Sequence, residues 1–473
     1  MTRLCESMLS IKKAKSSKPF SGLPDPFSHG AQIYKNPVRA SVRQGFLCSP
    51  LRPNLIRVLD ICDLTFFICA PPCLQTSYWW TFIRAGLQRG LKAGLVRATG
   101  NKGGKSMLAG VRIIEIEALG PAPFAAMLLA DLGADIITIH RKLAAETPGK
   151  GAENLLDRGK RSIALDLKDP KDTQILKRLL KTADGLIEGF RPGVMERLGL
   201  GPKDCHQIRP QLIYGRMTGW GQTGPKAAQA GHDLNYIGLS GALWYASAPG
   251  DIPIAPATLV GDIGGGAMYL TVGMLAGLLK ARATGAGCVV DAAIVDGSAH
   301  MMNLLMSLRS SGGFQTMRGQ SLLDGPHWSR VYRCGDGGYF TVQALEPKFY
   351  AQFLDLMGLA GDVDFTDQFD QTRWPVLTRR LAQIFVEKPR AHWSAIFANS
   401  DACAGPVLNP EEAMAETHMQ ARGVWSAPEG RLQAAAAPRF DGANPSIPSP
   451  IPRRDQDRCS ILDELEQLER AAP

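Results

Sequence analysis

Residues 111–140 have the sequence VRIIEIEALGPAPFAAMLLADLGADIITIH, and this stretch decides the fold class. The apolar run at 111–116 predicts a buried strand, and a Gly-Pro-Ala-Pro turn follows it at 120–123. The alanine-rich run at 124–132 predicts a buried helix, and 135–140 predicts a second strand. A strand, a helix and a strand in this order predict a βαβ unit on a parallel sheet.

The same alternation continues down the chain and predicts an α/β fold with a Rossmann-like parallel sheet in a large domain, 107–317. Further strands are predicted at 162–167, 185–190, 212–217 and 289–293, with helices at 169–182, 264–279 and 295–308.

The pattern changes near Arg318, and a smaller α+β domain is predicted over 318–410. Strands at 331–333 and 339–343 flank a Gly-rich turn, which is typical of a hairpin, and helical segments follow. Residues 411–473 are predicted to return to the large domain and to end in a helix at 461–470.

The first 106 residues differ from the rest in charge and cysteine content. They hold 16 Lys and Arg and 4 Asp and Glu, a net charge of +12, whereas the whole chain carries +9, which leaves 9 − 12 = −3 for the remainder. The basic balance of the whole chain therefore gives no support for a nucleic-acid role of the main body. We expect an extension that is disordered or not native to the protein, with Met107 as the start. The alternative is a mitochondrial leader; without one, a cytoplasmic bacterial enzyme is expected.

The sequence lacks the residue patterns that several kinds of binding site require. The turn at 118–123 lacks the G-x-G-x-x-G pattern that a dinucleotide site requires. The sequence Gly104-Lys105-Ser106 ends like a phosphate-binding loop, but the first glycine of that motif would fall on Thr99. No cysteine pair has C-x-x-C spacing, which argues against zinc, and scattered single cysteines favour a reducing compartment. The apolar stretch 60–82 is interrupted by charges and prolines and does not predict a membrane span.

His232 and Asp262 are the main catalytic candidates. His232 lies in Gly-His-Asp-Leu-Asn-Tyr at 231–236, and Asp262 lies in Val-Gly-Asp-Ile-Gly-Gly-Gly at 260–266. The simpler explanation of His232 is a histidine buried in the core. The simpler explanation of Asp262 is the N-cap of a helix. An N-cap does not exclude a function, because a helix N-terminus offers free N–H groups, and the glycines are expected to let a ligand approach the backbone.

From Met107 to about residue 455 the chain resembles the family III CoA-transferase superfamily and, within it, the α-methylacyl-CoA racemases. The matching stretches are LDRGKRSIALDLK at 156–168, GFRPGVMERLGLGP at 189–202, GHDLNY at 231–236 and LEPKFY at 345–350.

The resemblance implies specific catalytic roles. In the transferases the residue that matches Asp262 is a nucleophile, whereas in the racemases a histidine matching His232 and the later aspartate are two bases. It therefore implies interconversion of (R)- and (S)-2-methylacyl-CoA by α-proton transfer through an enolate, in lipid and fatty acid metabolism. The alternative is a transferase that moves CoA between carboxylic acids, with Asp262 as its nucleophile. A non-catalytic CoA-binding homologue is the third possibility.

The resemblance also implies partners and binding residues. It implies an acyl-CoA substrate, chemistry that requires no metal or redox cofactor, and an interlocked homodimer in which Glu346, the third catalytic candidate, reaches the site from the partner and orients His232 or shares its proton. From the charge and apolar patterns we expect no nucleic-acid partner and no membrane span. Arg191 is set aside, since Arg-Pro-Gly is typical of a structural turn. The residues expected to hold the CoA ester are Arg141, Ala164, Leu165, Asp166, Leu167, Lys168, Arg197, Gly231, His232, Asp233, Leu234, Asn235 and Tyr236.

Overall fold

The structure is a computed structural model that describes residues 106–143, 154–443 and 449–471. The expectations for residues 1–105 lie outside these described ranges. The predicted α/β fold class is confirmed. Six parallel strands form one sheet in the order β3 (Arg161–Ala164), β2 (Asp135–His140), β1 (Arg112–Ile116), β4 (Gly185–Glu188), β5 (Ile213–Thr218) and β6 (Cys288–Ala293). This is the strand order of doubly wound nucleotide-binding sheets.

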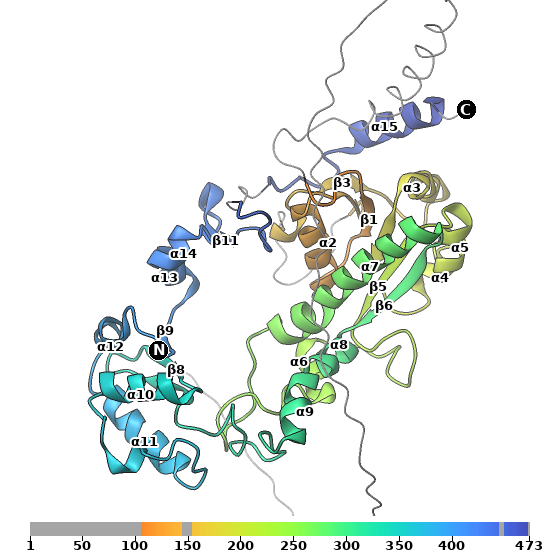
Figure 1. Ribbon diagram of the computed structural model, residues 1–473. Helices are drawn as coiled ribbons and strands as arrows, with labels where there is room; N and C mark the ends of the chain where they lie inside the picture. Colours follow the sequence, from red (N-terminus) through yellow and green to blue (C-terminus); the bar gives the residue numbers. More distant parts are fainter. Residues whose placement is uncertain (1–105, 144–153, 444–448, 472–473) are drawn as a thin grey trace, which may run out of the picture. The chain divides into compact units, whose positions relative to one another are not determined.

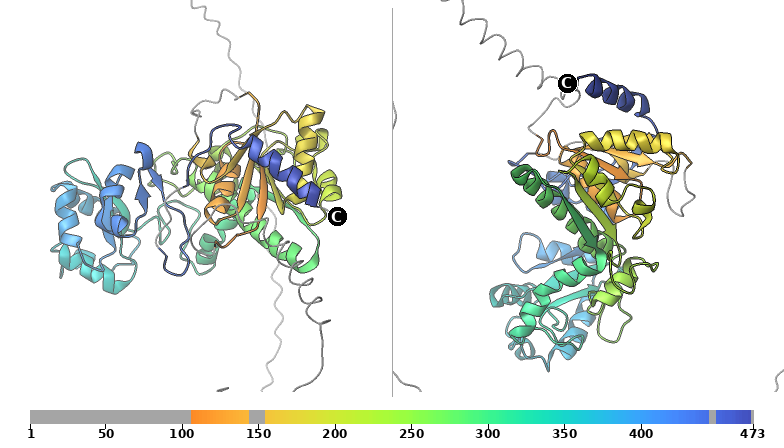
Figure 2. Two further views of the ribbon diagram at one scale, coloured as in Figure 1. Left: turned by 90° about the horizontal axis from the view of Figure 1, so that it is seen from above. Right: turned by 90° about the vertical axis from the view of Figure 1, so that its right-hand side faces the viewer.

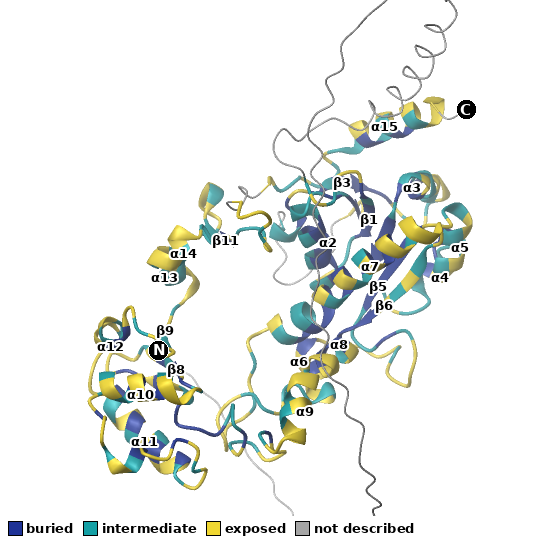
Figure 3. Cartoon of the chain, viewed as in Figure 1, coloured by how far each residue is buried: buried dark blue, intermediate teal, exposed yellow. Residues whose placement is uncertain are grey.

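Helices cover both faces of the sheet (Figures 1 and 2). On one face Ile113 and its neighbours pack against α2 (Pro121–Asp131) and α7 (Met268–Thr284). On the other face Ile114 packs with α3 (Pro170–Thr182), α5 (Pro202–Ile208) and α15 (Arg458–Ala471). Burial on both faces explains why the strands are continuously apolar in the sequence. The dark blue strands of Figure 3 show the same burial.

The helix predicted at 264–279 begins earlier and has a different first part. It starts with a π-helix, η2 (Leu259–Ala267), in which the Ile263 N–H donates to the Thr258 carbonyl five residues before it. The apolar periodicity continues through both parts, so it could not show the change of hydrogen bonding at Met268. Wide π turns are rare and are frequent at functional sites.

The single helix predicted at 295–308 is two helices, α8 (Ile294–Met301) and α9 (Asn303–Ser310). At Met302 the backbone N–H donates only three residues back, to the Ala299 carbonyl, and this interrupts the α-helical pattern. None of the methionines Met301, Met302 and Met306 is buried in the chain.

The second region has its own core, built largely from aromatic rings. Strands β7 (Ser329–Arg333) and β8 (Tyr339–Gln343) form the predicted hairpin, and β9 (Ala404–Val407) adds a third antiparallel strand. The sequence did not indicate β9, because its Gly405 and Pro406 are poor strand formers. Helices α10 (Pro347–Leu356), α11 (Trp374–Phe385) and α12 (Arg390–Phe397) pack against the same core.

The C-terminal segment covers the open edge of β3. Asp457 accepts a hydrogen bond from the Ser162 N–H at 2.8 Å, and its own N–H donates to the Ser162 carbonyl at 3.0 Å. Pairing of this kind protects the edge strand. The remaining short elements are η1 (Leu155–Asp157), α4 (Val194–Arg197), α6 (Asp233–Ser240), η3 (Val363–Phe365), α13 (Pro410–Ala415), α14 (Thr417–Ala421), β10 (Trp425–Ser426), η4 (Pro428–Gly430) and β11 (Gln433–Ala434).

Within the described residues one helix, Leu259–Thr284, is long and apolar enough to cross a membrane. The core helix of a soluble protein meets the same criterion, and α7 packs against the sheet through Leu270, Met274 and Leu278.

Candidate active site at the switch point of the sheet

The candidate site lies at the carboxyl ends of the central strands. The chain leaves neighbouring strands β1 and β4 toward opposite halves of the sheet, and ligands of doubly wound folds bind at this switch point. Gly120 follows β1 and begins α2, and an added Cβ there would stand 3.5 Å from Asp262 Oδ2. The Asp262 carboxylate therefore faces the switch point.

His232 is held at the start of α6. It is the N-cap of that helix, and its backbone N–H donates to Asn235 Oδ1 at 3.0 Å. The Tyr236 hydroxyl donates to the Gly231 carbonyl, and the Tyr236 ring packs edge-on against Trp220 with the centroids 4.7 Å apart. The His232 side chain is exposed in the chain, so a buried core histidine does not describe it.

Asp262 is bound to the residue that follows His232. Its backbone N–H donates to Asp233 Oδ1 at 2.9 Å, while Asp233 Oδ2 is buried without a partner among the described residues. Gly261 is needed for this approach, because a Cβ there would lie 2.3 Å from Asp233 Oδ1. The bond joins the first turns of η2 and α6 and brings His232 and Asp262 into one site.

The N-cap interpretation of Asp262 is wrong. Thr258, not Asp262, is the residue that precedes η2, so Asp262 is no N-cap, and its own N–H is already bonded to Asp233. At least one of the glycines that follow is needed for packing, while ligand approach to their backbone stays a prediction. A Cβ on Gly265 would lie 2.3 Å from Ser298 Oγ, so this glycine allows α8 to lie against η2.

The electrostatics of the site raise the pKa of Asp262 to about 6. Burial is the largest cause and the negative charge of Asp233 the second, while a protonated His232 acts in the opposite direction. Burial and the charge of Asp262 also raise the pKa of Tyr236, and Arg191 lowers it. A carboxyl group that titrates near neutrality is suited to donate and accept protons.

Glu346 is placed differently. It is the N-cap of α10, its side chain is exposed, and its charge contributes to the raised pKa of Cys403. Among the described residues of this one chain, no contact joins Glu346 to His232 or Asp262. Its role from a partner subunit and the homodimer both stay predictions.

The residues predicted to bind the CoA ester fall into separate places. Arg141 follows β2 and is exposed, and 164–168 run from the end of β3 into the turn before α3. In that turn Asp166 accepts from the Lys168 N–H at 3.0 Å. Arg197 ends α4, which follows β4, and its guanidinium lies against Gly193. The structure therefore groups Arg141 with 164–168 and leaves Arg197 apart.

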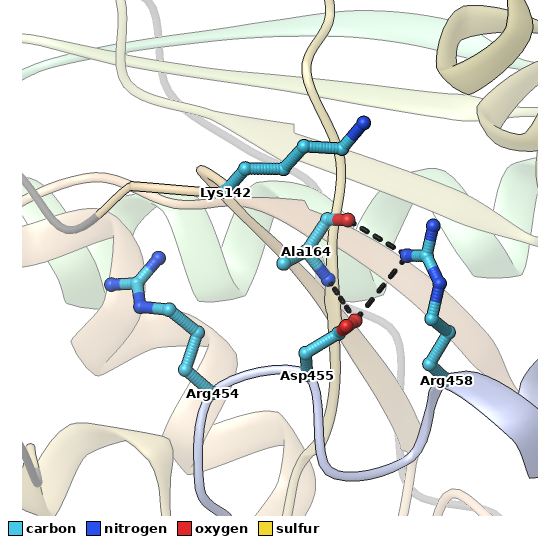
Figure 4. A pocket seen from close by; sticks show the side chains of 5 residues that line it. All are labelled: Lys142, Ala164, Arg454, Asp455 and Arg458. Atoms are coloured by element: carbon cyan, nitrogen blue, oxygen red, sulfur yellow. Dashed lines mark hydrogen bonds and ion pairs between the residues drawn. The ribbon is translucent and has the colours of Figure 1, made fainter.

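A hollow of about 420 Å³ lies beside this first group. It is lined by Lys142, Ala164, Arg454, Asp455 and Arg458 (Figure 4). Only Ala164 was predicted from the sequence. The dense charges of Arg-Arg-Asp-Gln-Asp-Arg at 453–458 were the available signal. The sequence analysis also set Arg191 aside, although its positive charge lowers the pKa of Tyr236.

Comparison with known proteins identifies the family. A sequence profile of CoA-transferase family III matches residues 108–458. The chain belongs to CoA-transferase family III. As a member of this family it is 38% identical to mouse α-methylacyl-CoA racemase over 345 residues, which cover 72% of this chain and 88% of the relative. It is 28% identical to human succinyl-CoA:glutarate CoA-transferase over 382 residues, 76% of this chain and 86% of the relative.

A solved structure of a family member has the same fold. The crystal structure of a CAIB/BAIF family protein from Brucella suis matches with a TM-score of 0.65 and 26% identity, covering 75% of this chain and 98% of that one. The relatives thus include racemases and CoA-transferases, and the family is enzymatic. In the described ranges no group of three or more His, Cys, Asp and Glu residues is arranged to hold a metal ion.

Proposed function

We propose that this family III enzyme interconverts the (R) and (S) forms of 2-methylacyl-CoA thioesters by moving the α-proton. The observation that supports this most directly is the pairing of His232 with Asp262 at the switch point, through the bond from Asp262 N–H to Asp233 Oδ1. An imidazole is a common general acid and base, and a carboxyl group whose pKa is about 6 changes protonation near neutrality, as proton transfer between two bases requires.

The reaction needs one base free and the other protonated. The free base removes the proton from the carbon next to the thioester, and the electron pair of the broken C–H bond delocalises onto the carbonyl oxygen as an enolate. The other group donates its proton to the opposite face of the same carbon. Substrate and product then differ only in configuration, and the two groups have exchanged protonation states.

The alternative activity is transfer of CoA between carboxylic acids. Asp262 would then attack the thioester carbonyl as a nucleophile and form an anhydride with release of CoA. The relation to succinyl-CoA:glutarate CoA-transferase favours this alternative. The exposed His232 beside Asp262 favours proton transfer, because acyl transfer by a carboxylate needs no second base there.

Solvent deuterium separates the two activities. The full-length protein is incubated in D₂O with one enantiomer of a 2-methylacyl-CoA and no acceptor acid, and the α-carbon is followed by NMR or mass spectrometry. We expect one deuterium per molecule at the α-carbon, together with loss of optical purity. Exchange that appears only when an acceptor acid is added, or not at all while CoA is transferred, contradicts the racemase proposal.

The pH dependence should follow the raised pKa of Asp262. For the enantiomer whose α-proton Asp262 removes, kcat/KM is expected to fall as the pH drops through about 6, because the protonated carboxyl group cannot act as a base. Burial is the main cause of the raised pKa and the charge of Asp233 the second, and Asp233→Asn keeps an oxygen for the Asp262 N–H but removes that charge. The inflection should therefore move to lower pH in the variant. An inflection at the same pH in both proteins would assign it to another group.

A further inference from the structure

The Tyr236 ring, in the first turn of α6, is in close contact with the backbone of two glycines. Gly219 comes directly after β5, and Gly231 comes directly before His232. A Cβ on Gly219 would overlap the Tyr236 ring, and one on Gly231 would lie 2.7 Å from Cε1 of the same ring. Glycine at both positions leaves room for the side chain. The ring therefore holds the start of α6 against the end of β5.

The peptide unit between Gly231 and His232 is fixed on both sides by side chains of α6. Its carbonyl oxygen accepts a hydrogen bond from the Tyr236 hydroxyl, and its N–H donates to Asn235 Oδ1 at 3.0 Å. Because a peptide unit is planar, these two bonds fix its plane, and that plane determines the direction from which His232 begins. The imidazole is exposed in the chain, so its direction depends on this backbone more than on packing around the ring.

The Tyr236 hydroxyl is suited to remain a donor in this bond. Burial raises its pKa above the ordinary value of 10, and the negative charge of Asp262 raises it further, while Arg191 acts in the opposite direction. The hydroxyl therefore keeps its proton near neutrality. Trp220 packs edge-on against the same ring, with the centroids 4.7 Å apart, and this contact limits rotation of the ring.

We propose that Tyr236 is a positioning residue for His232, and that the bond from its hydroxyl to the Gly231 carbonyl holds the imidazole where it exchanges a proton with the α-carbon. This inference rests on the proposed two-base reaction. Tyr236 does not take part in the chemistry itself, because its hydroxyl hydrogen is used within the chain. It acts through the peptide unit before His232, on which Asn235 acts from the other side.

The fate of a single enantiomer separates the two bases. When Asp262 removes the α-proton, the electron pair of the C–H bond moves onto the thioester oxygen. The enolate then takes a proton either from Asp262, with retention of configuration, or from His232, with inversion. In D₂O the first route also gives exchange, once the carboxyl group has traded its proton with solvent. A displaced His232 therefore lowers inversion and spares exchange with retention.

Tyr236→Phe tests the proposal, because it removes the hydroxyl and keeps the ring between the glycines. The informative substrate is the enantiomer that still exchanges in His232→Gln. For it we expect inversion to fall by about tenfold to a hundredfold, as a displacement of about 1 Å or less causes, while exchange stays within about threefold of wild type. For the other enantiomer, exchange and inversion should fall together. Asn235→Ala removes the acceptor of the His232 N–H and should produce the same imbalance. Mass spectrometry measures exchange, and chiral chromatography measures inversion.

Tyr214→Phe is the matched control. The Tyr214 hydroxyl also donates to a backbone carbonyl, that of Leu200 at 2.9 Å, but Tyr214 packs in the core on the other face of the sheet. This variant loses the same kind of bond and should keep the wild-type ratio of inversion to exchange. A ratio that is unchanged in Tyr236→Phe, or that falls equally in Tyr214→Phe, overturns the proposal. So does an equal loss of exchange and inversion for both enantiomers, which indicates a general loss of structure.

The position of the imidazole is also measured without a substrate. In protein with carbon-13 histidine, the NMR signal of His232 Cε1 is assigned by its absence from His232→Gln. We expect this signal to move or broaden in Tyr236→Phe and to stay in place in Tyr214→Phe. If the signal behaves in this way while the wild-type protein shows no α-proton exchange, the positioning role stands and the racemase proposal fails. If exchange occurs while the signal and the ratio are unchanged in Tyr236→Phe, the racemase proposal stands and the positioning role fails.

Discussion

Asp262→Asn is expected to lower the rate of α-proton exchange by about 10²–10⁴-fold, the usual contribution of a positioned general acid or base. Asparagine keeps the size of the side chain and leaves the backbone bond from residue 262 to Asp233 in place. It removes only the group that takes or gives the proton. The measurement is deuterium incorporation under single-turnover conditions, which excludes product release from the observed rate.

The stability of this variant should show that the loss is chemical. In the folded protein the pKa of Asp262 is about 6, above its ordinary value of 3.8. Folding therefore favours the protonated carboxyl group, and the stability that this gives is present below pH 3.8 and lost as the pH rises through about 6. At pH 7 the ionised side chain is a disadvantage in the folded state. The asparagine variant should unfold at the same temperature as the wild-type protein or slightly higher.

Two comparisons complete the test. Asp251→Asn, in an exposed loop, makes the same chemical change away from the site and should leave exchange unaltered. An Asp262→Asn protein that retains exchange within about tenfold of wild type contradicts a role for Asp262 in proton transfer. Loss of exchange accompanied by a large fall in unfolding temperature assigns the effect to folding.

The strands of the large sheet could be predicted from sequence because they are buried on both faces. β2 lies where its six residues predicted it, since Asp135 and His140 enclose three isoleucines and one β-branched threonine. The π-helix could not be predicted in this way. Its geometry depends on the close packing of Gly265 against Ser298, a contact between residues 33 positions apart in the printed sequence.

The candidate site shows the same division. His232 and Asp262 were found from residue type and resemblance, but the contact that joins them runs through Asp233, whose role as an acceptor for the Asp262 N–H appears only in three dimensions. Arg454 and Arg458 carry no local pattern of a binding loop. They reach Ala164 because the C-terminal segment pairs with the edge of β3, nearly 300 residues away from them in the chain.

Lys160→Met is expected to destabilise the protein by about 3–5 kcal/mol, the usual cost of leaving one partner of a buried ion pair without the other. Lys160 Nζ lies 2.6 Å from Glu115 Oε2, and both side chains are almost completely buried. Lys160 also donates to the Pro123 carbonyl at 3.1 Å, in the first turn of α2. Denaturation by urea, followed by circular dichroism, measures the loss.

The double variant Lys160→Met/Glu115→Gln separates the charge from the packing. It removes both charges and keeps a group that can accept from the Thr138 hydroxyl, which donates to Glu115 at 2.8 Å. We expect it to regain at least half of the lost stability. The single variant should also lose less at lower pH, because burial already raises the pKa of Glu115 and removal of Lys160 raises it further. Protonation then relieves the unpaired charge. If the double variant is as unstable as the single one at every pH, the ion pair is not the cause, and the contact between Lys160 and the start of α2 accounts for the loss.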